Sequence, residues 1–245
     1  MKVAILFTGI PRFCAIFNSQ LAYLQNASCI DWYCSFWSTK ESETFNSFSS
    51  KWTNPSWDFK TPPEAMRWLY KRLPSNHRIL NLDLVSPEQF PSMPVYQATA
   101  SHNLSNWGQY QILQHASHKL FNSGIEYDLV IRSRVDKGLE RGINLIKCKD
   151  YLENHQHEIL ISKNFRHGPL DFCDQFAIGL PKTMAIYTNC VDTFSEVHLS
   201  GVPWNAELVL GFSLSRYQIK WPSTDIVLIN SPHEHDNQAH WGIWV

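Results

Sequence analysis

The sequence predicts an α/β protein with a mostly parallel central sheet flanked by helices. An unbroken apolar run of strand length, Val3 to Phe7, suits a parallel strand that is covered on both faces. A second apolar segment, Ile30 to Trp37, follows a helical pattern, and strand, helix, strand in this order indicates a right-handed βαβ unit. A third buried strand, Tyr127 to Ile131, follows the clearest helical pattern of the chain.

The remaining elements are assigned in chain order. In the first part we expect a helix at 13–24, a polar surface segment at 38–63, a helix at 63–73 and a strand at 78–85. The clearest helix spans 105–121, with Ser105 as its cap, Gly124 as its stop signal, and an apolar face of Tyr110, Ile112, Leu113, Ala116 and Leu120. Later we expect strands at 159–161 and 175–179 and helices at 183–194 and 206–217.

Composition excludes several classes of protein. The net charge of -1 leaves no basic excess for binding nucleic acid through its phosphates. No apolar stretch reaches the roughly 20 residues that span a bilayer, and the run after Met1 is too short for a signal peptide. The six cysteines show no C-x-x-C pair or zinc spacing, so we expect reduced thiols in a cytoplasmic protein. The ten Trp, nine Tyr and fourteen Phe serve either core packing or stacking on sugars and bases.

The first strand ends in an unusual turn, Thr8-Gly9-Ile10-Pro11-Arg12. In open parallel sheets, ligands bind at the carboxyl ends of the strands. Gly9 allows close approach of the backbone to a ligand, and Arg12 can meet a phosphate in a forked geometry. A tight strand-to-helix turn explains Gly9 and Pro11 equally well.

The third strand runs into Arg132-Ser133-Arg134-Val135-Asp136. Strand geometry points Arg132, Arg134 and Asp136 to one side, where two cations and one anion can hold a diphosphate and a metal ion. The alternative is a self-neutralising cluster of ion pairs. We favour a functional role, because a charged cluster has little reason to sit on a buried strand.

These motifs resemble those of small GT-A-type glycosyltransferases from bacterial and viral surface-polysaccharide gene clusters. The matching residues, in order, are Gly9-Ile10-Pro11-Arg12, Asp31 with Trp37, Gln109, Arg132-Ser133-Arg134-Val135-Asp136, Asp174-Gln175-Phe176 before Gly179, and Glu207. The resemblance covers roughly residues 1–215. It implies one GT-A-like domain over 1–245, with a Rossmann-like nucleotide-sugar-binding half at 1–136 and an acceptor-side half at 137–245.

The resemblance also implies where the donor binds. Thr8, Gly9, Pro11, Arg12, Gln109, Arg132, Arg134 and Asp136 are its expected donor-binding residues. Asp136 resembles the last aspartate of the Asp-x-Asp motif, which holds a divalent metal at the donor diphosphate. Because Arg134 stands where that motif has its first aspartate, arginine can replace the metal in neutralising phosphate. If a metal binds, oxygen ligands suit Mn²⁺ or Mg²⁺.

Sugar transfer to a hydroxyl needs a carboxylate that takes the acceptor's proton. Asp174 is the first candidate, Glu207 the second, and Asp171 lies close in sequence. Asp174 as a turn cap and Glu207 as an ordinary helix residue remain alternatives. In the tail, His233 and His235 are candidate metal ligands, and a solvated polar tail is the alternative.

The sequence therefore predicts a glycosyltransferase that moves a sugar from a nucleotide-sugar donor to a hydroxyl of a glycan or related acceptor. The alternatives are a nucleotidyltransferase that activates a sugar phosphate and a non-catalytic nucleotide- or sugar-binding protein. A nucleotidyltransferase needs a longer glycine-rich loop with a lysine than the turn at Gly9 offers.

Overall fold

The computed structural model describes residues 1–9, 24–37, 70–71, 73–86, 89–90, 101–134, 137–164, 166 and 170–229. Its main strands are β1 (Lys2–Gly9), β3 (Cys29–Trp37), β4 (His77–Val85), β5 (Leu129–Arg134), β8 (Leu160–Ile161) and β9 (Phe176–Gly179). The helices are α4 (Ser101–Phe121), α5 (Leu145–Asn154), α6 (Pro181–Asn189), η3 (Cys190–Thr193), α7 (Phe194–Leu199) and α8 (Ala206–Arg216). Short strands are β2 (Leu24–Gln25), β6 (Gly138–Leu139), β7 (Ile143–Asn144) and β10 (Leu228–Ile229).

Six strands form one sheet in the order β4-β3-β1-β5-β9-β8. Strands β4, β3, β1 and β5 run parallel, and β9 is antiparallel to both of its neighbours. The expected α/β class with a mostly parallel sheet flanked by helices is therefore confirmed. The antiparallel β9 has a consequence for the site, because it brings the residues that precede β9 to the carboxyl end of β5.

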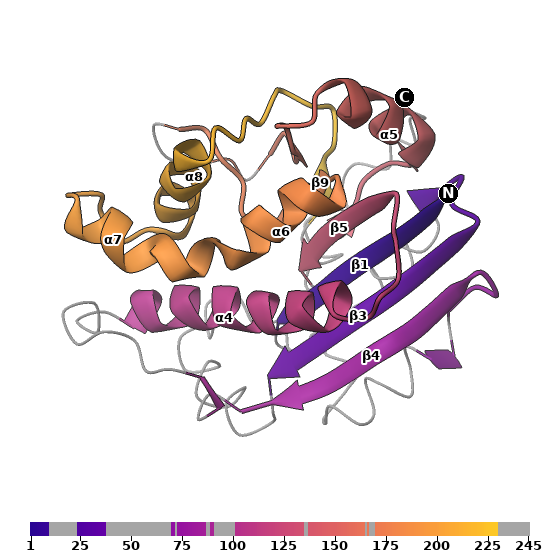
Figure 1. Cartoon of the computed structure of the whole chain (residues 1–245), viewed down its shortest axis with the longest axis horizontal. Helices are drawn as coiled ribbons and strands as arrows, with labels where there is room; N and C mark the ends of the chain where they lie inside the picture. The colour runs from indigo at the N-terminus through magenta and orange to yellow at the C-terminus, as the bar shows by residue number, and fades with distance from the viewer. Residues whose placement is uncertain are drawn as a thin grey trace, which may run out of the picture.

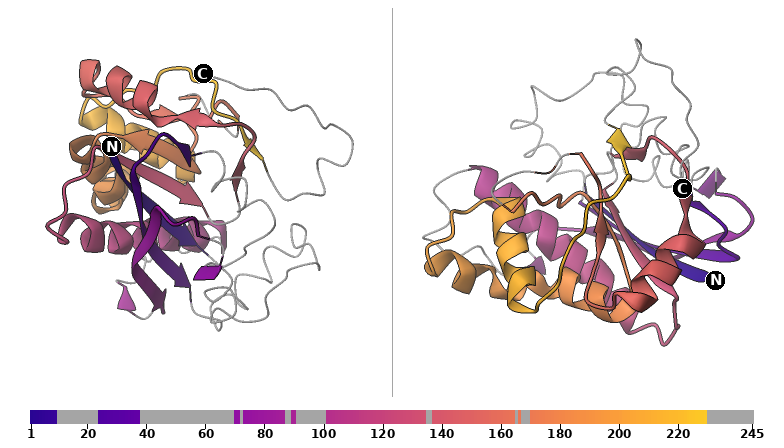
Figure 2. Two further views of the ribbon diagram at one scale, coloured as in Figure 1. Left: turned by 90° about the vertical axis from the view of Figure 1, so that its right-hand side faces the viewer. Right: turned by 90° about the horizontal axis from the view of Figure 1, so that it is seen from above.

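Helices α4 and α6 lie side by side across one face of the sheet (Figures 1 and 2). Helix α4 packs on β1 and β3, whereas α6 packs on β5 and β9. The five residues expected on the apolar face of α4 are all buried. One hydrophobic cluster draws on residues from both expected halves of the chain, from Val3 to Leu228.

Three expectations about helices need correction, and one helix was not expected. Helix α4 begins at Ser101, so Ser105 lies inside the helix and is not its cap; a lone serine is only a weak signal for the start of a helix. The expected helix at 183–194 is divided into α6, η3 and the start of α7. Helix α5 was not expected, although Asn144 caps it by accepting hydrogen bonds from two backbone amides. Leu24, the last residue of the helix expected at 13–24, lies in β2. The rest of that helix, the segment at 38–63 and most of the helix at 63–73 lie outside the described residues.

A buried carboxylate, paired with a half-exposed arginine, joins the amino ends of the strands. The Asp31 carboxylate is fully buried and accepts two hydrogen bonds from Arg78, from Nε at 2.7 Å and from Nη2 at 2.8 Å. The Tyr127 hydroxyl donates a third bond to it at 2.9 Å. Asp31 therefore lies at the end of the sheet opposite to the expected donor site, where it joins β3, β4 and the segment before β5.

We expect Asp31→Ala to lower the free energy of unfolding by about 2 kcal/mol, because it removes a buried carboxylate that accepts hydrogen bonds from Arg78 and Tyr127. Urea denaturation measures this change. Glu196→Ala is the matched control, since the Glu196–Arg216 pair (3.0 Å) is at least half exposed at both side chains. That control should change stability by less than about 1 kcal/mol. Equal effects of the two substitutions would contradict the structural role of Asp31.

At the same end of the sheet, a neutral histidine packs on the opposite face. The Trp32 indole donates a hydrogen bond to Nδ1 of His77 at 3.1 Å. Burial lowers the pKa of His77 to about 4, so the ring is neutral near pH 7 and its nitrogen can accept. His77 thus completes the core, where Phe7 packs edge-on against Trp32.

Candidate functional site

The carboxyl ends of β1 and β5 lie next to each other, with Thr8 in register with Arg134. Strand order reverses at this point, because the chain continues from β1 to β3 on one side and returns as β5 on the other. Open α/β sheets bind ligands at such a switch point. Gly9 ends β1 with φ of 137°, a conformation that other residues rarely adopt, so the turn depends on glycine.

A row of polar side chains crosses four strands near this end. Asp83, Ser35, Thr8 and Arg134 are successive register partners on β4, β3, β1 and β5. Register partners point to the same face of a sheet, and the row faces α4, since His115 of α4 hydrogen-bonds Asp83 at 3.1 Å. The hydroxyl oxygens of Thr8 and Ser35 are buried and have no hydrogen-bond partner within the described ranges.

Three of the expected site residues form one hydrogen-bonded chain. Nη1 of Arg134 donates to Oε1 of Gln109 at 3.3 Å, and Nε2 of Gln109 donates to Oδ2 of Asp174 at 2.6 Å. The three residues come from β5, from α4 and from the segment before β9. The order in sequence gave no sign of this contact, which depends on the antiparallel direction of β9.

Asp174 lies at the buried end of that chain, with 3% of its surface exposed. Its Oδ1 is buried and has no hydrogen-bond partner among the described residues. Two tyrosines lie against it, and the hydroxyl of Tyr187 donates to its backbone carbonyl at 3.3 Å. Burial first, and then the nearby Asp174 carboxylate, raise the pKa of the Tyr110 hydroxyl, so this tyrosine remains a neutral donor.

The two arginines of the motif have different environments. Arg132 is fully buried, and its Nη1 donates to the Gln175 carbonyl at 2.6 Å. Arg134 is partly exposed at the strand end. Of the two, Arg134 is therefore the one placed to meet a bound anion. Lys137 is a buried polar residue that the sequence reasoning missed, and only its position three residues after Arg134 could have drawn attention to it.

Helix α8 brings Glu207 to the same region. Asn205 caps this helix, and Glu207 lies half-buried in its first turn, where the helix dipole favours a carboxylate. The Tyr110 hydroxyl lies 3.2 Å from the Ala206 carbonyl and 3.5 Å from Oδ2 of Asp174, and its single proton can be donated to either acceptor. Glu207 also contributes to raising the pKa of Tyr110, after burial and the larger effects of Asp174 and Tyr187. Both candidate carboxylates therefore lie around one tyrosine.

Five expected site residues lie outside the described part of the chain: Pro11, Arg12, Asp136, His233 and His235. All three expected metal ligands are among them. Within the described ranges, no group of three or more His, Cys, Asp or Glu side chains is arranged to hold a metal ion. The five described cysteines are free thiols.

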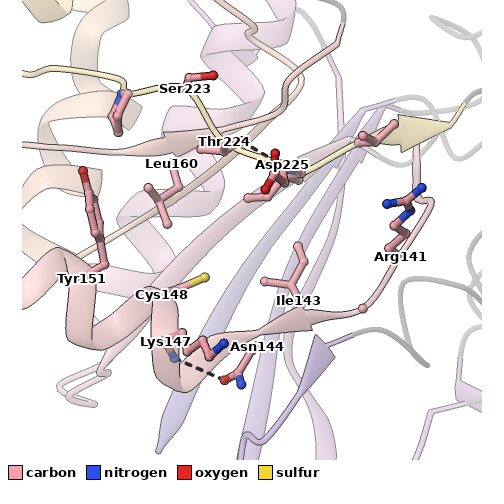
Figure 3. Close-up of a pocket in the computed structure, with 14 residues that line it drawn as sticks. Arg141, Ile143, Asn144, Lys147, Cys148, Tyr151, Leu160, Ser223, Thr224 and Asp225 are labelled. Carbon is pink, nitrogen blue, oxygen red and sulfur yellow. Dashed lines mark hydrogen bonds between the residues drawn. The ribbon is translucent and has the colours of Figure 1, made fainter. Parts of the chain in front are cut away.

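A separate pocket of about 350 Å³ lies on the other face of the sheet. Figure 3 shows Cys148 and Tyr151 rising from α5 toward the segment that carries Ser223, Thr224 and Asp225. Leu160 lines this pocket. It is in register with Ile178, which is in register with Ile131. Ile131 is next to the buried Arg132 on β5, so Leu160 and Arg132 point to opposite faces of the sheet. None of the expected site residues lines it. Burial raises the pKa of the Cys148 thiol to about 11, so the pocket presents a neutral thiol at neutral pH.

The sequence matches no known family model, and no curated protein matches it. No helix within the described ranges is both long enough and apolar enough to cross a bilayer. The class that the structure itself supports is an α/β protein with a Rossmann-like, mostly parallel sheet.

Proposed function

We propose that this chain is a GT-A-like glycosyltransferase that uses a nucleotide-sugar donor and transfers the sugar to a hydroxyl of a glycan or related acceptor. One observation carries the proposal. A partly exposed arginine, Arg134, lies beside the glycine turn at the switch point of the sheet and is tied through Gln109 to a buried carboxylate. A cation beside a glycine at the carboxyl end of a parallel strand suits a diphosphate.

In this proposal the diphosphate of the donor lies at the carboxyl ends of β1 and β5. As the bond between sugar and diphosphate breaks, negative charge grows on the leaving nucleoside diphosphate. The Arg134 guanidinium stabilises that charge through the field of a fixed cation and its N–H donors. Gly9 allows the backbone to approach the phosphates without a side chain in the way. Arg12 and Pro11, which lie outside the described residues, remain proposed donor-binding residues.

A divalent metal, Mn²⁺ or Mg²⁺, would supply further positive charge at the diphosphate, with Asp136, His233 and His235 as its proposed ligands. The described residues contain no alternative metal cluster. Because Arg134 already supplies positive charge at this strand end, we propose that the described residues bind the nucleoside diphosphate even before a metal is added.

The acceptor hydroxyl loses its proton to a carboxylate, for which Asp174 and Glu207 are the candidates. Oδ2 of Asp174 accepts from Gln109, so the proposed proton acceptor is its Oδ1, which is buried and receives a proton only if the acceptor hydroxyl gains access to it. Glu207 is partly exposed and lies around the same tyrosine. Substitution of each carboxylate in turn shows which of the two takes the proton.

A thermal-shift screen against nucleoside diphosphates and nucleotide sugars, with and without Mn²⁺, tests the proposal. We expect at least one nucleoside diphosphate to raise the melting temperature, because ligands that bind only the native state stabilise it. The corresponding nucleoside without phosphates is the control and should give little shift. A set of nucleotides that gives no shift at all would overturn the proposal.

Turnover separates the remaining alternatives. A glycosyltransferase releases nucleoside diphosphate from its donor, slowly with water and faster with an acceptor. A nucleotidyltransferase instead releases pyrophosphate from a nucleoside triphosphate and a sugar phosphate. A non-catalytic binding protein gives a thermal shift and no turnover of either kind.

A further inference from the structure

The chain of hydrogen bonds through Gln109 has only one possible direction. A guanidinium has donors and no acceptor, and an ionised carboxylate has acceptors and no donor. The side-chain amide between them must therefore turn its oxygen to Arg134 and its nitrogen to Asp174, as the distances of 3.3 Å and 2.6 Å show. Of the twenty side chains, glutamine and asparagine alone carry an amide with both groups, and asparagine is shorter by one methylene.

We propose that Gln109 is a positioning residue, which fixes the Arg134 guanidinium at the end of β5 so that it is already oriented when a diphosphate arrives. This inference rests on the proposed function and deepens it, because it changes the expected role of Gln109. Gln109 acts through Arg134, and contact with the donor is not needed for its effect. The hydrogen bonds from Arg134 through Gln109 to Asp174 form a bridge, and the buried Asp174 carboxylate is its fixed end.

The expected gain in affinity comes from the conformational entropy of the Arg134 side chain. An arginine side chain that is not held samples many rotamers, and binding of a phosphate would otherwise remove that freedom. Anchoring one Nη group to Gln109 removes part of that freedom before binding, so the affinity for the diphosphate rises. The anchor is itself rigid, since it joins helix α4 to the segment before β9.

Charged and titratable groups surround the Asp174 end from every described element packed against it. These groups are Tyr110 from α4, Tyr187 from α6, Arg132 from β5, Glu207 from α8 and the adjacent Cys173. Burial raises the pKa of both tyrosine hydroxyls and of the Cys173 thiol. If stability or affinity depends on pH between about 5 and 8 only in a variant with an acid at position 109, that dependence therefore reports on the hydrogen bonds made by residue 109.

Gln109→Glu converts the bridge into a pH-dependent one. When protonated, the new carboxyl group donates to Asp174 and accepts from Arg134, as the amide does. When ionised, it faces the Asp174 carboxylate across the site of a 2.6 Å hydrogen bond, and two carboxylates so close hold one proton with a raised pKa. A raised folded-state pKa means that stability is retained at low pH and lost as pH rises through that pKa.

We expect the melting temperature of Gln109→Glu to fall further below that of the unsubstituted protein as pH rises from 5.5 to 8. Its affinity for the nucleoside diphosphate found by the screen should be within about 3-fold of normal at pH 5.5 and about 10-fold weaker at pH 8. Gln109→Met, which removes both hydrogen bonds, should weaken binding about 10-fold at both pH values. Calorimetric titration without metal measures these affinities.

Gln114→Glu is the matched control. Gln114 lies more than one turn further along the same helix, is half-buried, and donates to Oδ1 of Asn189 at 3.1 Å and to the Asp192 carboxylate at 2.9 Å. It should leave the affinity for the diphosphate unchanged at both pH values.

Each outcome decides the inference. Parallel changes in melting temperature and affinity support it. A pH-dependent melting temperature with normal affinity would show that the bridge is structural, and it would overturn the positioning role. A melting temperature with no added pH dependence would show that the bridge is absent. If the unsubstituted protein binds no nucleotide, the proposed function fails, whereas the melting temperatures still report on the bridge itself.

Discussion

Asp174→Asn is expected to reduce sugar transfer by at least about 100-fold while binding of the nucleoside diphosphate is retained. Asparagine keeps the size of the side chain and offers an amide oxygen to Nε2 of Gln109, so the hydrogen bond of 2.6 Å can persist. What is lost is the negative charge and the basicity. Initial rates of transfer, together with calorimetric titration of the diphosphate, separate the chemical step from binding.

Two further variants show which carboxylate takes the proton. Glu207→Gln tests the partly exposed candidate on α8, and an equal or larger loss there would transfer the role of base to Glu207. Asp171→Asn is the matched control, because this aspartate is close in sequence but exposed, and it is paired with Arg166 at 3.4 Å. It should keep near-normal transfer.

The loss of diphosphate binding in Asp174→Asn would give a different answer. It would mean that the buried carboxylate acts only by holding Gln109 and Arg134. Near-normal transfer in both Asp174→Asn and Glu207→Gln would instead indicate a retaining mechanism in which the enzyme supplies no base to the acceptor.

Arg134→Ala is expected to weaken binding of the nucleoside diphosphate by about 10- to 100-fold, whether or not a metal is used. A charge-assisted hydrogen bond to phosphate is among the strongest polar contacts, and its loss leaves the phosphate without a fixed cation. Calorimetric titration in the presence of a chelator, and again with Mn²⁺, measures the change. Arg134→Lys should recover only part of the affinity, because an ammonium lacks the planar fork of the guanidinium.

The control for that experiment is Arg216→Ala. Arg216 forms a surface ion pair with Glu196 at 3.0 Å, at the far end of α8, so its removal changes the net charge by the same amount without touching the strand ends. Equal weakening by both substitutions would show a general effect of charge and would contradict a specific phosphate contact by Arg134.

Much of the fold could be predicted from local patterns. The strands at Val3 to Phe7 and Ile30 to Trp37 are continuous apolar runs, and such runs are stable only when buried on both faces. The buried face of α4 follows from its helical spacing. Helix α5 escaped prediction because only two of its ten residues are buried, so its apolar pattern is short. The two-residue strands are too short for any periodicity to show.

The candidate site was predictable in part. The polar residues after β1 and β5 stand out because charge at the end of an apolar strand is unusual, and parallel pairing of the two strands then places their ends together. The difference between Arg132 and Arg134 was not predictable, since alternation puts both on one face. Only the residues packed above them decide that Arg132 is buried and Arg134 partly exposed.

The class of the fold, the direction of the first strands and the residue types at their ends follow from the local order of apolar and polar residues. Which of those residues come into contact depends on how distant segments pack together. Gln109 and Asp174 are 65 positions apart, and their contact requires α4 to cross the sheet and β9 to return antiparallel beside β5. Asp31 shows the opposite case, since a motif residue that matched in sequence order lies at the amino end of the sheet, where Arg78 and Tyr127 bind it.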